Sequence, residues 1–408
     1  MSETFLAVPS EIGGLSVLVK EIGEDCTAAS NYIAKNGPAA DWLSGPIIDE
    51  LIPYIEAAAT ATQRRMGDIA IITGESASEL KTAAWMYHSK DQQTYEALNK
   101  HKVNLATRES VPVSSDQESA GYTLEYEGSA SYPKAENVDL AVPTANKEDT
   151  AALIAEVFPP LGQINDAIKS ITRMAGNEID VMGKALNPIP GNWNEVRRIG
   201  EAYKIAGNAM EASGKNLDAG LAKVDPHWDG KARLAFGDWA VAQSAAMKWE
   251  GPVGRIIADI LGLAADKIRN AVKWIIEQIK KLLESRIKIT SLEGALRFVA
   301  NKIPVVGTAN EIREIGTRLY EIIKGTIDMV LEITKLRDQI MHLLEVIKDP
   351  AAAGKAKVTE VLEQKIQPYL KRAAVADDVA KIANLNSTLN RPKNDFEVGS
   401  GRDPWADA

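Results

Sequence analysis

The sequence predicts an all-α protein, with two long helical hairpins packed as an elongated four-helix bundle and additional heptad-repeat helices toward the C-terminal end. Apolar residues recur in steps of three and four over most of the 408 residues, which is the spacing of one face of an α-helix. Segments that alternate apolar and polar residues, as half-buried strands do, are almost absent. Gly and Pro cluster between the periodic segments, where they act as helix stop signals.

The first hairpin is expected over residues 1–101. An apolar stripe covers residues 12–33 in alternating steps of three and four, and the Asn-Gly-Pro of residues 36–38 ends it. A second helix is expected to begin at Ile47 and to carry a similar stripe toward the end of this unit. Such a hairpin is too thin to bury both of its faces, so it needs a partner.

A polar linker is expected over residues 102–148. Helical periodicity vanishes there, and the composition turns to Ser, Thr, Glu, Pro and Gly. Alternation at Tyr122, Leu124 and Tyr126 is typical of a short β-ribbon, which the linker could carry.

The second hairpin is expected within a helical region over residues 149–290. The region starts with a helix that is broken near Pro159-Pro160. A regular apolar stripe then covers residues 196–221, and a turn with Pro and Gly follows at residues 224–230. The next helix passes through Gly251-Pro252 and continues with a strong apolar stripe.

A C-terminal helical arm is expected over residues 291–385, followed by a disordered tail over residues 386–408. The heptad stripe from Ile312 to Ile347 belongs to a helix about 58 Å long, given a rise of about 1.5 Å per residue. A stripe of this length must lie against another element, so we expect either an assembly surface or a brace along the second hairpin. The tail is polar and rich in Gly, Pro and Asp, as disordered ends are.

Composition and charge exclude several classes of protein. Hydrophobic residues make up 45% and charged residues 25% of the chain, which excludes wholesale disorder. The net charge of -9 argues against a nucleic-acid partner, since phosphate binding needs a basic surface. No apolar stretch reaches the ~18 residues of a membrane-spanning helix. The N-terminal residues lack the basic start of an ordinary secretory signal peptide.

No motif predicts catalysis. The sequence contains no P-loop, dinucleotide fingerprint, H-E-x-x-H or G-x-S-x-G pattern. The single cysteine, Cys26, excludes an intramolecular disulfide and a cysteine-based zinc cluster, and its place on an apolar stripe predicts a buried hydrophobe. Around His227, the two carboxylates of Asp225 and Asp229 are better explained as helix caps than as metal ligands. We therefore expect no enzyme, no catalytic residue, no cofactor and no bound metal.

Two short constellations lie at landmarks of the hairpins. Trp228-Asp229-Gly230 occupies the turn of the second hairpin, where the glycine can take the backbone conformation of a reversal and the tryptophan offers a large apolar face. Tyr87 and Asp91 lie four residues apart, so they share one helix face near the end of the first hairpin. The plainer alternatives are a tryptophan that plugs the end of a bundle and a chance spacing of Tyr and Asp.

Together these constellations resemble the composite export signal of the WXG and PE/PPE superfamily, whose members leave the cell through type VII (ESX) secretion systems. The segment from Leu80 to Asp91 is similar to the L-x-x-A-A-x-x-Y-x-x-x-D ending of such hairpins. The segment from Trp228 to Phe236 has the W-x-G-x-A-x-x-x-F pattern of WXG proteins. In these families the two elements usually come from two chains, whereas here one chain holds both, as in the EspB-like fusions of a PE-like and a PPE-like hairpin.

The resemblance implies an export signal formed by Tyr87, Asp91, Trp228 and Gly230 and recognised by the ATPase of the type VII machinery. It implies synthesis in the cytoplasm, export without a cleavable signal peptide to the outside or the cell surface, and a non-enzymatic structural or interaction role. A homo-oligomer would be compatible with that role. For one surface to contain both motifs, the hairpins must pack head to tail, with the Tyr87 and Trp228 backbones within roughly 20 Å.

Two alternatives remain open. The first is a helical membrane-disrupting or toxin-type effector with a WXG-like leader, because residues 251–265 and 303–307 are strongly apolar. Membrane contact is not predicted, however, since a buried helix explains these stretches equally well. The second is a cytosolic coiled-coil scaffold in which both motifs are accidental.

Overall fold

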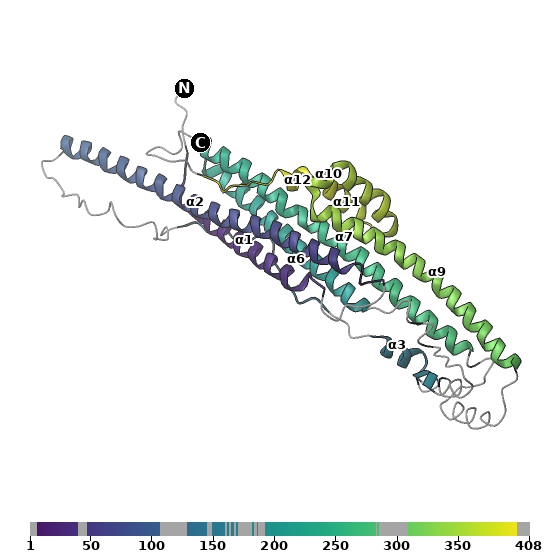
Figure 1. Ribbon diagram of the computed structural model, residues 1–408. Helices are drawn as coiled ribbons and strands as arrows, with labels where there is room; N and C mark the ends of the chain where they lie inside the picture. Colours follow the sequence, from purple (N-terminus) through teal and green to yellow (C-terminus); the bar gives the residue numbers. More distant parts are fainter. Residues whose placement is uncertain are drawn as a thin grey trace.

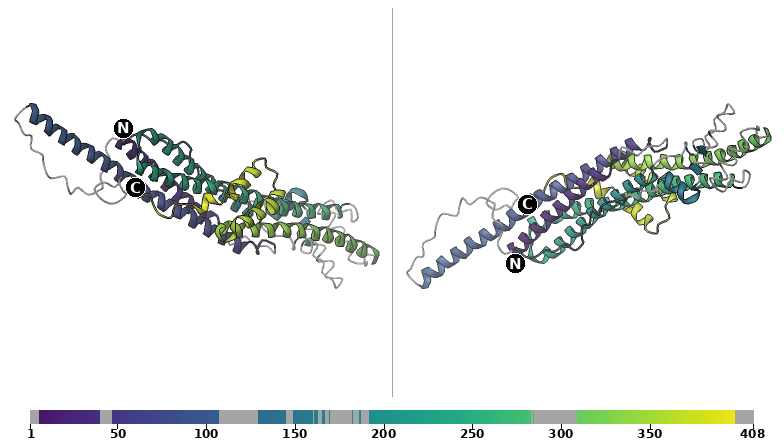
Figure 2. Two further views of the ribbon diagram at one scale, coloured as in Figure 1. Left: turned by 90° about the horizontal axis from the view of Figure 1, so that it is seen from above. Right: turned by 90° about the horizontal axis from the view of Figure 1, so that it is seen from below.

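The protein is an elongated all-α rod in the computed structural model (Figures 1 and 2). The structure describes residues 6–39, 47–106, 129–144, 149–159, 192–282 and 309–397, together with isolated positions between residues 161 and 186 and at residue 284. In these ranges the chain forms helices, turns and extended segments but no β-strand, which confirms the predicted class. No helix in the described part of the chain is long and apolar enough to cross a membrane.

The first hairpin consists of α1 (Pro9–Asn36) and α2 (Ile52–Ala106). The predicted stripe of α1 is buried between the helices, and Gly37 ends α1 by donating its N–H to the Ile33 carbonyl at 2.8 Å. With 55 residues against 28, α2 is much the longer helix. It therefore projects past the other helices at one end of the rod (Figure 1). The helix ends at Ala106, five residues after residue 101, where this unit was expected to end.

A short helix, α3 (Thr150–Val157), precedes the second hairpin. The Asp149 side chain caps it by accepting a hydrogen bond from the Ala152 N–H at 2.7 Å. The helix ends before Pro159, as predicted from the break in the sequence.

The second hairpin consists of α6 (Trp193–Val224), the short 3₁₀ turn η1 (Asp225–His227) and α7 (Lys231–Leu282). Three glycines of α6, seven residues apart, allow the two helices to approach closely: Gly200, Gly207 and Gly214. A Cβ atom on Gly214 would lie 2.9 Å from the Ser244 carbonyl oxygen, and one on Gly200 would lie 3.0 Å from the Ala258 Cα. These three residues therefore form a glycine row that brings the α6 and α7 backbones together.

The two hairpins meet mainly through α1 and α6, where Leu15 and Leu18 pack over Gly220. Contact between α2 and α7 centres on buried Gln243, whose Nε2 donates to the Ile69 carbonyl at 3.0 Å and to Thr73 Oγ1 at 2.9 Å. A further helix, α9 (Ala309–Lys348), lies against both α2 and α7. The predicted packing of the hairpins as a four-helix bundle stays a prediction.

An extended segment of residues 129–144 lies along α1 and α6, inside the predicted linker. The Asn216 side chain binds both backbone groups of Glu136 in this segment. Its Oδ1 accepts from the Glu136 N–H at 2.7 Å, and its Nδ2 donates to the Glu136 carbonyl at 3.0 Å. Lys134 pairs with Asp25 at 2.6 Å. This part of the linker is therefore ordered, because side chains of the helices satisfy its backbone groups. The alternation at residues 122–126 lies outside the described residues.

The C-terminal arm begins with α9 (Ala309–Lys348), which runs along α7 as a brace. The buried positions of its stripe include Ile333, Leu336, Ile340 and Leu343. At the start of the stripe, the side chains of Ile312 and Ile315 lie outside the described ones. The brace is one of the two roles expected for this helix, and the assembly surface stays a prediction.

Four short helical segments and one π-helical segment then fold back onto the middle of the rod: α10 (Pro350–Thr359), η3 (Glu360–Ile366), η4 (Gln367–Tyr369), α11 (Val375–Ala383) and α12 (Asn386–Leu389). The buried Asp378 attaches α11 to α7 by accepting from Arg255 at 2.8 Å and from Arg372 at 2.6 Å. Burial by itself would raise the pKa of Asp378, but the hydrogen bonds from the two guanidinium groups outweigh it and lower that pKa.

The disorder predicted for residues 386–408 is wrong over residues 386–397. Residues 386–389 form α12, Arg391 pairs with Asp68 of α2 at 2.6 Å, and Phe396 is buried. One ion pair and one buried aromatic side chain thus order a segment whose average composition is polar. Residues 398–408 lie outside the described part.

Candidate functional site

Five aromatic side chains meet where the turn of the second hairpin reaches α2. We call them the tip cluster: Tyr87, Trp228, Phe236, Trp239 and Phe396. The centre of the Trp228 ring lies 6.5 Å from that of Tyr87, 5.9 Å from that of Phe236 and 6.4 Å from that of Phe396. The Phe236 ring in turn lies 5.6 Å from the Trp239 ring. These separations are typical of packed aromatic pairs, so one aromatic core joins three distant parts of the chain.

Tyr87 and Trp228 are in direct contact, which confirms the predicted proximity of the two motifs. Trp228 Nε1–H donates a long hydrogen bond of 3.4 Å to the Tyr87 hydroxyl oxygen. Both side chains are buried, with 6% of Tyr87 and 1% of Trp228 exposed. Burial raises the pKa of Tyr87, and the hydrogen bond from Trp228 opposes this only in part. The phenol is therefore neutral and acts as an acceptor for the indole.

Gly230 follows Trp228 with a φ of 89°, in the left-handed region that side chains with a Cβ rarely occupy. The predicted role of this glycine in the reversal is confirmed. It lets α7 begin at Lys231 directly after the extended Trp228-Asp229 pair.

Residues 6–8 clamp this turn from the N-terminal side. Ala7 and Trp228 form an isolated antiparallel bridge, with the Val8 N–H donating to the His227 carbonyl at 2.9 Å. Asp229 binds Leu6 twice: its N–H donates to the Leu6 carbonyl at 2.8 Å, and its Oδ1 accepts from the Leu6 N–H at 2.8 Å. Neither clamp residues 6–8 nor the buried Phe396 belongs to the export signal expected from the sequence.

The carboxylates flanking His227 are engaged in contacts within the protein. Asp225 pairs with Arg233 of α7, and Asp229 binds the Leu6 N–H. No group of side chains suited to holding a metal ion occurs among the residues that the structure describes.

Asp91 lies in α2, one helical turn beyond Tyr87. Its side chain is outside the described ones. The structure therefore brings together three of the four residues expected in the export signal, Tyr87, Trp228 and Gly230, and places the fourth only on its helix.

The single cysteine lies away from the tip cluster. Cys26 is fully buried on α1, and this burial raises its pKa to about 12. Its thiol is therefore neutral at physiological pH, which agrees with its predicted packing as a small hydrophobe.

Comparisons with protein-family models, with curated proteins and with solved structures found no match. The resemblance to type VII substrates thus depends on the quoted motifs and on the geometry of the tip cluster.

Proposed function

We propose that this protein is a non-enzymatic substrate of a type VII (ESX) secretion system, with Tyr87, Asp91, Trp228 and Gly230 as its export signal. The contact between Tyr87 and Trp228 carries the proposal. These residues are 141 positions apart in the sequence, and the fold brings them to one place, as a composite signal requires. This argues against the scaffold alternative, in which each motif arises by chance.

The export ATPase would recognise a folded surface in this proposal. The tip cluster fixes the W-x-G turn against α2. This helix continues through Asp91 and projects past the other helices at its far end (Figure 1). A receptor could thus read the turn and the projecting part of α2 together. After export the rod would serve as a structural or interaction factor outside the cytoplasm or at the cell surface, either alone or as a homo-oligomer.

Export from a host with an active type VII system tests this proposal. We expect Tyr87→Ala, Asp91→Ala and Trp228→Ala to leave the protein in the cell, as deletion of the ATPase would. His88→Ala is the matched control, because His88 is an exposed neighbour of Tyr87 on the same helix. Helical content and melting temperature of each purified variant separate lost recognition from lost folding. Normal secretion of folded Tyr87→Ala and Trp228→Ala proteins would refute the proposal.

Leakage of dye from liposomes tests the effector alternative separately. A structural or interaction factor should leave vesicles intact, whereas release of the dye by the purified protein would favour the membrane-disrupting effector.

A further inference from the structure

The segment of residues 390–397, which we call the C-terminal strap, follows α2 from Asp68 to Ser76 and enters the tip cluster. Two anchors attach it. Near its start, Arg391 Nη2 lies 2.6 Å from Asp68 Oδ2. Near its end, the Phe396 ring packs edge-on against both Trp228 and Phe236, with ring centres 6.4 and 5.3 Å away.

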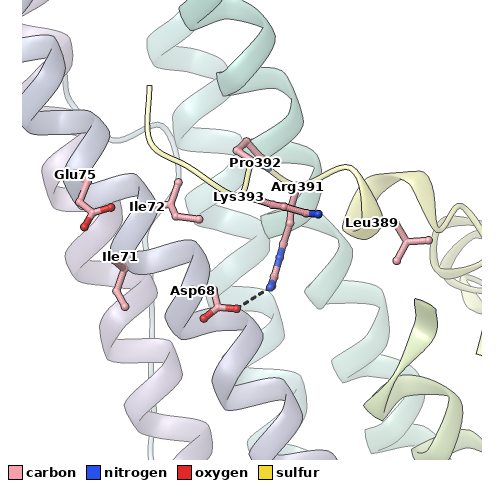
Figure 3. Close-up of a pocket in the computed structure, with 8 residues that line it drawn as sticks. All are labelled: Asp68, Ile71, Ile72, Glu75, Leu389, Arg391, Pro392 and Lys393. Carbon is pink, nitrogen blue, oxygen red and sulfur yellow. Dashed lines mark hydrogen bonds and ion pairs between the residues drawn. The ribbon is translucent and has the colours of Figure 1, made fainter. Parts of the chain in front are cut away.

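Close to the first anchor, the strap leaves a hollow that is open to solvent. A hollow of about 480 Å³ lies between α2 and the strap, lined by Ile71 and Ile72 on one side and by Leu389 and Pro392 on the other (Figure 3). Lys393 and Asn394 are exposed. The strap is thus attached mainly at its ends, whereas the helices of the rod are packed along their length.

The first anchor is weak. The side chains of Arg391 and Asp68 are 26% and 42% exposed, so water and salt screen their attraction. The second anchor is specific. The Phe396 ring packs against Trp228 and Phe236, and the Phe396 backbone N–H donates to Ser76 Oγ at 2.8 Å. We call the surface beneath the strap, from Asp68 and Ser76 of α2 to Trp228 and Phe236, the groove. It fits an extended backbone with a basic side chain and, five positions later, an aromatic one.

We propose that this groove is a docking site for an extended peptide of the export machinery with that basic and aromatic pattern, and that the strap is its displaceable intramolecular occupant. Binding of the partner would lift Phe396 off Trp228 and uncover one side of the export signal. The inference rests on the proposed function for the source of the peptide. The groove itself can be tested without any secretion system.

The test uses a labelled peptide with the sequence of residues 388–397 and fluorescence anisotropy. The full-length chain carrying Arg391→Ala and Phe396→Ala lacks both anchoring side chains of the strap, and we expect it to bind the peptide. The wild-type chain should bind at least about tenfold more weakly, because a tethered occupant competes at an effective concentration of about millimolar. A peptide in which the phenylalanine is replaced by alanine should fail to bind.

Helical content and melting temperature establish that the double variant is folded, and Arg391→Ala alone provides a milder opening of the groove if it is not. A folded open variant that ignores the peptide would overturn the proposal. So would equal binding to the wild-type chain, or binding that survives loss of the phenylalanine. Normal export of Tyr87→Ala would refute the proposed function and leave these binding results unaffected, so the two failures are distinguishable.

Discussion

Replacing Gly207 by alanine should loosen the second hairpin. A Cβ atom at this position would lie well under 3.0 Å from the Glu250 carbonyl oxygen and 3.3 Å from the Gly254 Cα. Both neighbours are backbone atoms of α7, so no change of side-chain rotamer can make room. The helices must move apart, and the contacts along the glycine row weaken with them.

Two opposing effects set the size of this change. Alanine is a better helix former than glycine by about 1 kcal/mol, whereas overpacking a tight interface costs about 1–3 kcal/mol. We expect the free energy of unfolding to fall by up to about 2 kcal/mol, since the backbone clash costs more than the gain in helix propensity returns. Gly262→Ala is the matched control on α7, because a Cβ atom there meets nothing within 4 Å. That variant should gain up to about 1 kcal/mol.

Urea unfolding followed by circular dichroism measures both variants. The midpoint should move to lower urea for Gly207→Ala and to higher urea for Gly262→Ala, with the slope unchanged. If Gly207→Ala proves as stable as Gly262→Ala, the α6 and α7 backbones do not approach as described.

Three further predictions concern other parts of the rod. Arg65→Ala removes the cation bound at 2.8 Å to Glu250, whose side chain is only 1% exposed, and should lower the free energy of unfolding by about 3–5 kcal/mol. Lys267→Ala, whose partner Glu332 is 67% exposed, should cost no more than about 1 kcal/mol; equal losses in urea unfolding would contradict this difference. Burial raises the pKa of Cys26 from 9.0 to about 12, so the unfolded chain loses this proton at lower pH than the folded one. Its contribution to stability should be complete below pH 9.0 and decline toward pH 12, and Cys26→Ala should make the decline measured by urea unfolding shallower; an identical decline in both proteins would count against a buried thiol. Asp229→Ala removes the acceptor of the Leu6 N–H and should cost about 0.5–1.5 kcal/mol, with faster hydrogen exchange at Leu6 and Val8; unchanged exchange there would show that the clamp holds without this carboxylate.

The helices could be predicted from the sequence because each carries its own periodic signal. The stripes of α1, α6 and α9 are visible in the sequence, and so are their stop signals. The seven-residue spacing of Gly200, Gly207 and Gly214 is also present in the sequence, but it yielded no prediction. Its meaning depends on the α7 backbone that faces it, which no local pattern reveals.

The extended segments could not be predicted in this way. Residues 129–144 and the C-terminal strap have no internal hydrogen-bond ladder, and their order depends on single residues such as Asn216 and Ser76 of distant helices. The same reason explains the tip cluster. Its Tyr87 and Trp228 belong to recognisable motifs, whereas Phe396 is one aromatic residue in a polar stretch.

The composition of the tip cluster also has a consequence during protein synthesis. Residues 6–8 form hydrogen bonds with the backbone on either side of Trp228, and the Phe396 ring packs against the Trp228 ring. The ribosome must therefore have added residue 396 before the Phe396 ring can complete the cluster. A nascent chain already carries Tyr87 and Trp228 but lacks the completed cluster. On the ribosome, one face of Trp228 therefore stays uncovered until Phe396 has been added.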